Sequence, residues 1–405
     1  MHGYLLSGLF LFACFGILAM RAGPPGDLEG AIRRHRMGTL CVQAPPGARV
    51  RVDQLEHEFW FGTAISHGLF RDDAEPEDRR RYLEILRENF NSAVHENALK
   101  WYQTERRRGE PDFTDAERMV AWCRDNGLRV RGHCIFWCVD RYVQDWLKEL
   151  DDGELRQAVE RRAREVPRRF RGRILEYDVN NEMLHGDFYK DRLGEGIRAD
   201  MFRWAAEEDP DALLFVNDYN ILSGKDAAAY ERQIQALLDA GAPVGGIGCQ
   251  GHFGGDIDMD EVRAALDRLA RFDLPIRITE FDINMDDEEK KARLLREFYR
   301  TCFAHPAVDG ILMWGFWRGR HWRPKAALWE KDFSPTPAAE AYRDLVFDRW
   351  WTEWEGEADG EGRCEVPAFY GRHRVTVGGK STEVNLRKAD GTVTLDARDD
   401  DTNAW

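Results

Sequence analysis

Two glutamates, Glu182 and Glu280, stand at the ends of short apolar runs of the chain. A carboxylate in such a place costs free energy unless a partner or a reaction makes use of it. Two carboxyls about 5–5.5 Å apart can cleave a glycosidic bond with retention, if one is protonated to release the leaving group and the other ionised to attack the anomeric carbon. Either glutamate alone is equally explained as a helix cap or a member of an ion pair. The pair together predicts an acid and a nucleophile.

Other polar residues of catalytic type, among them His133, Asn217 and Gln250, also end apolar runs. Between about residues 59 and 346, short apolar runs alternate with polar segments of helix length, which is typical of βα units around a parallel sheet. The eight runs are 59–65, 91–96, 128–133, 175–181, 213–217, 246–250, 276–281 and 310–316. Eight such units predict an α/β fold, a (β/α)8 TIM barrel, with its chemistry at the C-terminal ends of the strands.

Segments on both sides of the predicted barrel read as β structure. Near the N-terminus, 39–42 and 49–52 flank Pro45-Pro46-Gly47 as the strands of a hairpin would. Near the C-terminus, 374–377, 383–386 and 392–395 are strand-like and are separated by turn residues. We expect one small β appendage built from both ends, because so small a C-terminal piece is marginal alone. Its tryptophans fit either a binding module or packing against the barrel; they are Trp350, Trp351, Trp354 and Trp405.

The N-terminal region carries an uncharged apolar stretch over residues 5–20, which ends at Arg21. It is short for a membrane-spanning helix of about 20 residues and reads as the hydrophobic core of a signal peptide, although an uncleaved membrane anchor is an open alternative. The protein is therefore predicted to be secreted or periplasmic, or anchored through 5–20. The predicted division of the chain is 1–22 signal peptide or anchor, 23–58 linker and small β element, 59–347 catalytic barrel and 348–405 β-rich appendage.

Composition narrows the class of ligand. The 405 residues include 14 Trp, more than a core of this size needs, which suggests a surface that stacks on flat groups such as sugar rings. A net charge of −15 disfavours nucleic acid, because it repels a phosphate backbone. The eight Cys show no Cys-x-x-Cys spacing, so we expect buried thiols rather than a disulfide framework.

A zinc site is an alternative reading of one group of imidazoles and thiols, namely His133, Cys134, Cys138, Cys249 and His252. Neighbouring residues of a strand, such as His133 and Cys134, point to opposite faces, so few of these side chains would meet. No metal and no cofactor are expected.

Seven motifs in order resemble glycoside hydrolase family 10, the β-1,4-xylanase family, over about residues 59–345. They are Glu96-Asn97-Ala98-Leu99-Lys100-Trp101, Arg131-Gly132-His133-Cys134-Ile135-Phe136-Trp137, Asp178-Val179-Asn180-Asn181-Glu182, Asn217-Asp218-Tyr219-Asn220, Gly248-Cys249-Gln250-Gly251-His252, Ile278-Thr279-Glu280-Phe281-Asp282, and Trp314-Gly315 through Trp322. Any one motif is weak evidence, whereas seven in order on a matching fold are specific.

The resemblance implies a role for each matching residue. Glu182 would be the general acid/base and Glu280 the nucleophile. Asn181 would hydrogen-bond the sugar 2-hydroxyl, and Gln250 and His252 would surround Glu280, with Asp282 orienting His252. The residues implied to bind substrate are Glu96, Asn97, Lys100, His133, Trp137, Asn217, Tyr219, Trp314 and Trp322.

The implied function is a retaining endo-β-1,4-xylanase that hydrolyses xylan-type polysaccharide by double displacement. The open alternatives are another β-1,4-glycanase or xylosidase of the same family, and a barrel that only binds polysaccharide. Two departures bear on the subsites: Cys138 stands where a second His is common, and Met183-Leu184-His185 replaces a frequent small residue after the acid. The exact polysaccharide and the endo or exo mode therefore stay open at the level of sequence.

Overall fold

The computed structural model of the protein describes residues 27–398. The predicted leader, 1–22 with its apolar stretch 5–20, lies outside the described residues, as does Trp405. Within 27–398, no helix is both long enough and apolar enough to cross a membrane.

A closed ring of eight parallel strands forms the centre of the larger part of the molecule. These strands are β3 (Trp60–Ile65), β4 (Ser92–His95), β5 (Arg129–Gly132), β7 (Glu176–Asn181), β8 (Leu213–Asp218), β9 (Gly246–Phe253), β10 (Ile276–Ile283) and β11 (Val308–Met313). The pairing runs from β5 through β4, β3, β11, β10, β9 and β8 to β7, and a pairing of β5 with β7 closes the ring. Every predicted run overlaps one of these strands, so the (β/α)8 prediction is confirmed.

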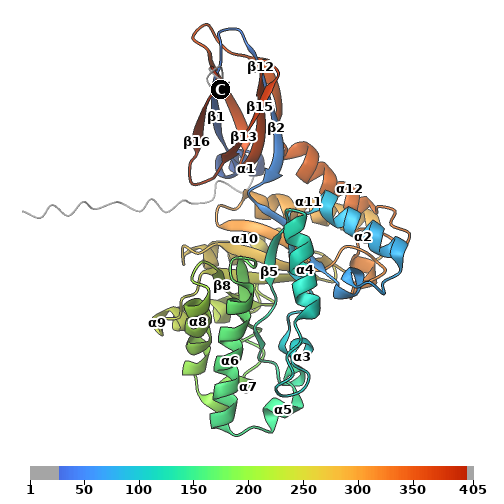
Figure 1. Cartoon of the computed structure of the whole chain (residues 1–405), viewed down its shortest axis with the longest axis vertical. Helices are drawn as coiled ribbons and strands as arrows, with labels where there is room; N and C mark the ends of the chain where they lie inside the picture. The colour runs from blue at the N-terminus through green and yellow to red at the C-terminus, as the bar shows by residue number, and fades with distance from the viewer. Residues whose placement is uncertain (1–26, 399–405) are drawn as a thin grey trace, which may run out of the picture.

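Each barrel strand is followed by a helix that packs on the outside of the ring (Figure 1). In chain order the helices are α2 (Pro76–Asn89), α4 (Thr114–Asp125), α6 (Asp152–Phe170), α8 (Gly196–Glu208), α9 (Ala227–Asp239), α10 (Met259–Ala270), α11 (Glu288–Ala304) and α12 (Pro337–Arg343). The longest, α6, begins at a capping box in which the Asp151 side chain accepts from the Glu154 N–H and Glu154 reaches back to the Asp151 N–H.

Shorter elements lie in the connections of the barrel. They are β6 (Phe136–Trp137), α3 (Trp101–Thr104), α5 (Asp145–Lys148), α7 (Phe188–Leu193), the 3-10 turns η1 (His67–Phe70), η2 (Asp140–Tyr142) and η3 (Pro324–Ala326), and the π-helical turn η4 (Asp344–Arg349). The predicted end of the barrel at residue 347 falls inside η4.

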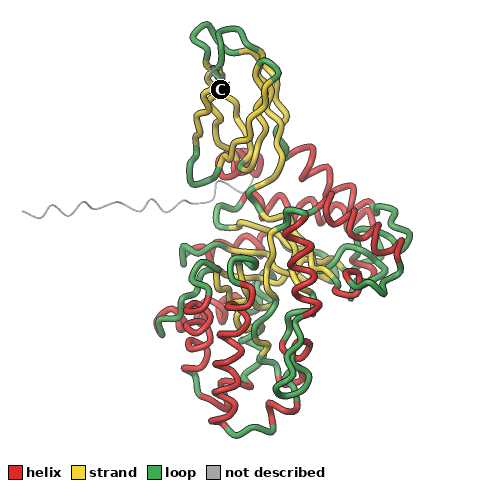
Figure 2. The backbone as a smooth tube through the Cα atoms, viewed as in Figure 1, coloured by secondary structure: helices red, strands yellow, loops and turns green. Residues whose placement is uncertain are grey.

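Both ends of the described chain form a β sandwich beside the barrel, seen as the second group of strands in Figure 2. Its strands are β1 (Met37–Gln43), β2 (Arg49–His57), β12 (Glu353–Glu357), β13 (Arg363–Phe369), β14 (Gly371–Val377), β15 (Lys380–Leu386) and β16 (Thr392–Asp396). One sheet has the order β13-β1-β16 and the other β12-β2-β14-β15. The predicted appendage from both chain ends is thus confirmed.

The predicted N-terminal hairpin, in contrast, is wrong. β1 and β2 do not pair with each other but lie in different sheets, where β1 pairs with β13 and β16 and β2 with β12 and β14. The turn at Pro45, whose carbonyl accepts from Ala48 (2.9 Å), carries the chain across the sandwich rather than along one sheet. Buried residues alternate along both strands, for example Val42 and Val50, and meet in the core between the sheets.

A helix that was not predicted, α1 (Leu28–Arg36), joins the sandwich to the barrel. Its last residue, Arg36, is buried and donates three hydrogen bonds to carbonyls near the end of α11, those of Phe303 (2.5 Å), His305 (2.6 Å) and Val308 (2.6 Å). On the same side Trp350 is buried and stacks on Phe303 with ring centroids 4.2 Å apart. Trp350 therefore packs against the barrel.

Candidate active site

A cavity of about 570 Å³ opens at the C-terminal ends of the barrel strands. Its lining contains every predicted site residue except Asn217 and Asp282, which lie buried directly behind it. It also contains residues that were not predicted, namely Tyr102, Arg141, Tyr142, Asn220, Leu222, Ser223, Phe253 and Arg323. One site thus gathers side chains from strands spread over most of the barrel, as the fold requires.

Glu182 follows directly after β7 and has a backbone φ of 60°, in the left-handed region that non-glycine residues rarely adopt. Its carboxylate accepts hydrogen bonds from Trp137 Nε1 (2.8 Å) and Gln250 Nε2 (3.2 Å). Burial, together with the neighbouring charge of Glu280, raises the pKa of Glu182 above its ordinary value. A carboxyl in this environment is suited to stay protonated and to act as an acid.

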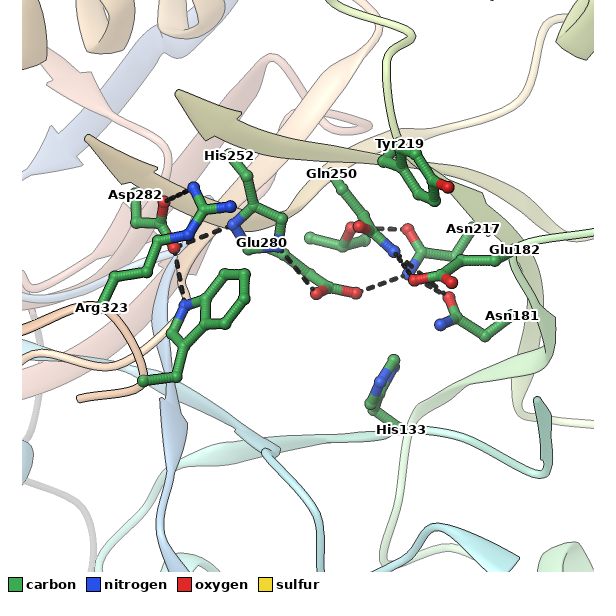
Figure 3. Close-up of polar contacts among 12 residues, drawn as sticks. His133, Asn181, Glu182, Asn217, Tyr219, Gln250, His252, Glu280, Asp282 and Arg323 are labelled. Atoms are coloured by element: carbon green, nitrogen blue, oxygen red, sulfur yellow. Dashed lines mark hydrogen bonds and ion pairs between the residues drawn. The ribbon is translucent and has the colours of Figure 1, made fainter. Parts of the chain in front are cut away.

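Glu280, at the end of β10, has the opposite environment. Burial alone would raise its pKa, but the hydrogen bond from His252 and the nearby positive groups outweigh burial and lower it. His252 Nε2 lies 3.2 Å from Glu280 Oε2, and His252 Nδ1 lies 2.8 Å from Asp282 Oδ2 (Figure 3). Burial alone would lower the pKa of His252, but the hydrogen bonds to Asp282 and Glu280 raise it to about 9. Both ring nitrogens therefore donate, and an imidazolium holds Glu280 ionised.

Side-chain amides connect the two carboxylates. Asn217 Nδ2 donates to Glu280 Oε1 and to Asn181 Oδ1, both at 2.9 Å, and Asn217 Oδ1 accepts from the Thr279 hydroxyl (2.6 Å). Gln250, expected beside Glu280, is the register partner of Glu280 on the neighbouring strand β9. Its Nε2 nevertheless donates to Glu182 rather than to Glu280, and His252, two residues on, makes the hydrogen bond to Glu280.

A buried layer of charged residues supports the site from below. Arg131 donates to Glu176 (2.6 Å) and to Asp178, and His133 Nδ1 lies 2.9 Å from Asp178 Oδ2. Arg277 Nε donates a further hydrogen bond to Glu176 (3.1 Å). Because these charges are paired, they can lie in the barrel interior and fix the orientation of His133 at the cavity wall.

Aromatic side chains form walls at both ends of the cavity. Trp137 stacks on Tyr142 (3.6 Å between centroids), and Lys100 Nζ lies 4.5 Å from the centre of the Trp137 ring. Lys100 also donates to Asn97 Oδ1 (3.1 Å). At the opposite wall, Trp322 is 48% exposed, as a platform for a sugar ring must be.

Asp282 orders that opposite wall. It accepts from Trp322 Nε1 (2.8 Å) and from Arg323 Nη1 (3.2 Å), in addition to its contact with His252. Arg323 was not predicted as a site residue, and the only feature of the sequence that could have indicated it is its position directly after Trp322. One carboxylate therefore fixes both the imidazolium beside Glu280 and the Trp322 platform.

The cysteines bear on the zinc alternative. All seven Cys of residues 27–398 are free thiols, and all but Cys41 are buried, as expected. Burial raises the pKa of the Cys134, Cys138 and Cys249 thiols, which disfavours the thiolate that a metal needs. Over the described part of the chain, no three His, Cys, Asp or Glu side chains are grouped to hold a metal ion.

A (β/α)8 barrel with one carboxyl of raised and one of lowered pKa in a sugar-sized cavity is an arrangement that glycoside hydrolases use. The family model for glycosyl hydrolase family 10 matches residues 52–345. The chain belongs to this family.

Two relatives and one solved structure illustrate the similarity. The chain is 39% identical to the anti-sigma-I factor RsgI6 of Acetivibrio thermocellus, over 85% of this chain and 45% of that protein. It is also 39% identical to endo-1,4-beta-xylanase 1 of Arabidopsis thaliana, over 82% of this chain and 34% of that protein. The chain thus spans less than half of either protein. The crystal structure of xylanase 10B from Thermotoga maritima superimposes with a TM-score of 0.67 at 28% identity, covering 72% of this chain and 96% of that one.

Proposed function

We propose that the protein is a retaining endo-β-1,4-xylanase that hydrolyses xylan-type polysaccharide by double displacement. The observation that carries the proposal is a pair of carboxyls in one cavity with different environments, Glu182 held by Trp137 and Gln250 and Glu280 held by His252 and Asn217. Burial and the charge of Glu280 raise the pKa of Glu182, whereas the hydrogen bond from His252 and the nearby positive groups outweigh burial and lower the pKa of Glu280. Double displacement rests on membership of family 10, in which the ionised carboxylate is the nucleophile. Membership of family 10 and relatives named endo-1,4-beta-xylanases support xylan as the substrate and an endo mode of cleavage.

In the first step the ionised Glu280 attacks the anomeric carbon, while Glu182 gives its proton to the glycosidic oxygen and the leaving sugar departs. The imidazolium of His252 and the Asn217 amide hold the Glu280 oxygens until the carbon–oxygen bond forms. In the second step Glu182, now ionised, takes a proton from water, and this water displaces Glu280 from the sugar. Trp137 and Gln250 donate to Glu182 and stabilise its ionised form between the two steps.

The test is hydrolysis of xylan followed by proton NMR of the anomeric signal from the first minutes, together with a product profile on β-1,4-linked glucan, mannan and xylan. We expect the β-anomer to form first, since two inversions at one carbon restore its configuration. We also expect xylan to be cleaved to a mixture of oligosaccharides. An α-anomer would refute double displacement. Release of xylose alone from chain ends would refute the endo mode, and faster cleavage of another polysaccharide would refute xylan.

We also propose that residues 5–20 direct the protein out of the cytoplasm, as a cleaved signal peptide or as a membrane anchor. The support is the uncharged apolar stretch itself. Fractionation of expressing cells, with N-terminal sequencing of the product, tests the proposal. A full-length product in the cytosolic fraction would contradict it.

A further inference from the structure

His185 lies three residues after Glu182 and is not among the residues that line the cavity. Its ring stacks on the Tyr219 ring, with centroids 3.6 Å apart and planes 14° from parallel. Tyr219 does line the cavity. One face of the Tyr219 ring is therefore covered by His185, which fixes the orientation of the ring in the cavity wall.

A buried carboxylate, Asp218, fixes both members of this stack. His185 Nδ1 donates to Asp218 Oδ1 (2.7 Å), and the backbone N–H of Tyr219 donates to the same oxygen (2.9 Å). The other oxygen accepts from the Leu184 N–H (2.8 Å). Asp218 thus ties the turn that follows Glu182 to the loop that follows β8.

On the far side of the imidazole, Nε2 lies 3.5 Å from Asp226 Oδ2, which also accepts from Asn220 Nδ2 (2.9 Å). The hydrogen bond to Asp218, helped by the charges of Asp218 and Asp226, raises the pKa of His185. This favours the imidazolium, and a cation against an aromatic face is attracted to it.

The Tyr219 ring stands on the side of the cavity where the leaving group departs. Figure 3 shows Tyr219 next to Glu182, while Asp282 and Arg323 lie beyond Glu280 on the opposite side. The acid acts on the glycosidic oxygen and the nucleophile on the anomeric carbon, so a line from Glu280 to Glu182 continues into the space for the leaving sugar.

The residue type at position 185 matters because a small side chain at this position could not cover a tyrosine ring. Without the stack, the Tyr219 side chain is free to change rotamer, and ordering it when a sugar binds costs conformational entropy and weakens binding. A flat ring held in advance is a better platform for a sugar face.

We propose that His185 is a positioning residue that holds Tyr219 as the platform for the leaving-group sugar, and thereby favours substrates that carry a sugar there. The proposal rests on the proposed function, since it concerns the same cavity. His185 acts through Tyr219 and does not touch the reacting atoms.

The test compares two substrates that both transfer a xylosyl glycone, xylohexaose, which carries sugars in the leaving-group space, and β-xylobiosyl fluoride, whose fluoride leaving group needs no platform. His185→Ala is expected to lower kcat/KM for xylohexaose about three- to tenfold, mainly through KM, which is the worth of one aromatic stack. The fluoride should react within about twofold of the wild-type rate. His185→Phe keeps a ring to stack and should retain most of the activity on xylohexaose. His35→Ala, in α1 and far from the cavity, is the matched control.

A double-mutant cycle separates positioning from a general structural effect. In a Tyr219→Ala background, His185→Ala should have no further effect on xylohexaose. Equal losses on both substrates, additive effects in the cycle, or a His185→Phe variant as slow as His185→Ala would each overturn the proposal. If the wild-type protein hydrolyses neither substrate, the proposed function fails, and this outcome is distinct from any of the three.

Discussion

The imidazolium of His252 should make the protein more stable at neutral pH than at alkaline pH. Burial opposes this charge, but hydrogen bonds from His252 to Asp282 and Glu280 raise its pKa from the ordinary 6.5 to about 9 in the folded protein. A folded-state pKa above the unfolded one stabilises the protein fully below pH 6.5, and this contribution is lost as the pH rises through about 9.

The size of the effect follows from the two values. At about 1.4 kcal/mol per pH unit, the imidazolium contributes about 3 kcal/mol below pH 6.5, about 2 kcal/mol at pH 7.5 and almost none at pH 10.5. His252→Gln replaces the ring with an amide that does not titrate, so the variant lacks this dependence. The difference in unfolding free energy between wild type and variant should therefore shrink by about 2 kcal/mol from pH 7.5 to 10.5.

Urea unfolding followed by tryptophan fluorescence, at half-unit pH steps, measures this difference. Other groups that titrate in alkali, such as the buried thiols, are present in both proteins and cancel. His35→Gln is the control. Desolvation lowers the pKa of His35 to about 4, so the unfolding free energy of this variant should change with pH over this range as that of the wild type does. Parallel curves for wild type and His252→Gln would refute the imidazolium between Asp282 and Glu280.

Three further predictions concern the catalytic pair and the junction of the barrel with the sandwich. Glu280→Ala should lower kcat by about four orders of magnitude or more, and azide should restore part of the activity on an aryl xylobioside with an α-glycosyl azide as product; a wild-type rate would contradict the nucleophile assignment. Glu182→Ala should lose the alkaline limb of the pH–rate profile, because in the wild type this limb reports deprotonation of the acid, whose pKa is raised. The variant should still give a burst of phenol from activated aryl substrates but should hardly cleave xylan. Equal loss of activity on both substrates would show that the role of Glu182 is structural. Arg36→Met leaves three carbonyls near the end of α11 without their donor and should lower the free energy of unfolding by about 3 kcal/mol, measured by urea denaturation; a change within about 0.5 kcal/mol would show that these hydrogen bonds add little.

The barrel was predictable because its strands are buried on both faces and so read as short continuous apolar runs, each followed by a segment of helix length. Polar residues at the ends of such runs stand out against them, and this is why Glu182, Glu280 and Gln250 were visible. Which carboxylate Gln250 bonds was not visible, since it depends on how the side chain reaches from β9 past β8 to the end of β7.

The sandwich was predictable only in part. Turn residues at Pro45 mark a reversal of the chain, but they do not say whether the strands on either side share a sheet, because their partners lie about 300 residues away in the sequence. The helix α1 did have a local signal, with Asp27 as its N-cap and apolar Leu28, Ala31 and Ile32 at helical spacing. His185 was visible only as part of the departure Met183-Leu184-His185, and its stacking was not, because the Tyr219 ring comes from the loop after another strand.

The strand order of the sandwich also dictates when it can form. β1 is the central strand of its sheet, and both of its neighbours, β13 and β16, come from the last part of the described chain. At about 5–20 residues per second, a ribosome needs roughly 15–65 s to travel from β1 to β13. Until β12, the first partner of β2, is synthesised shortly before β13, neither β1 nor β2 has a sheet partner, and the βα units of the barrel emerge one after another during that time. The first strands to be synthesised are therefore among the last to pair, and a chain that stops short of β12 leaves the edges of both β1 and β2 open to other chains.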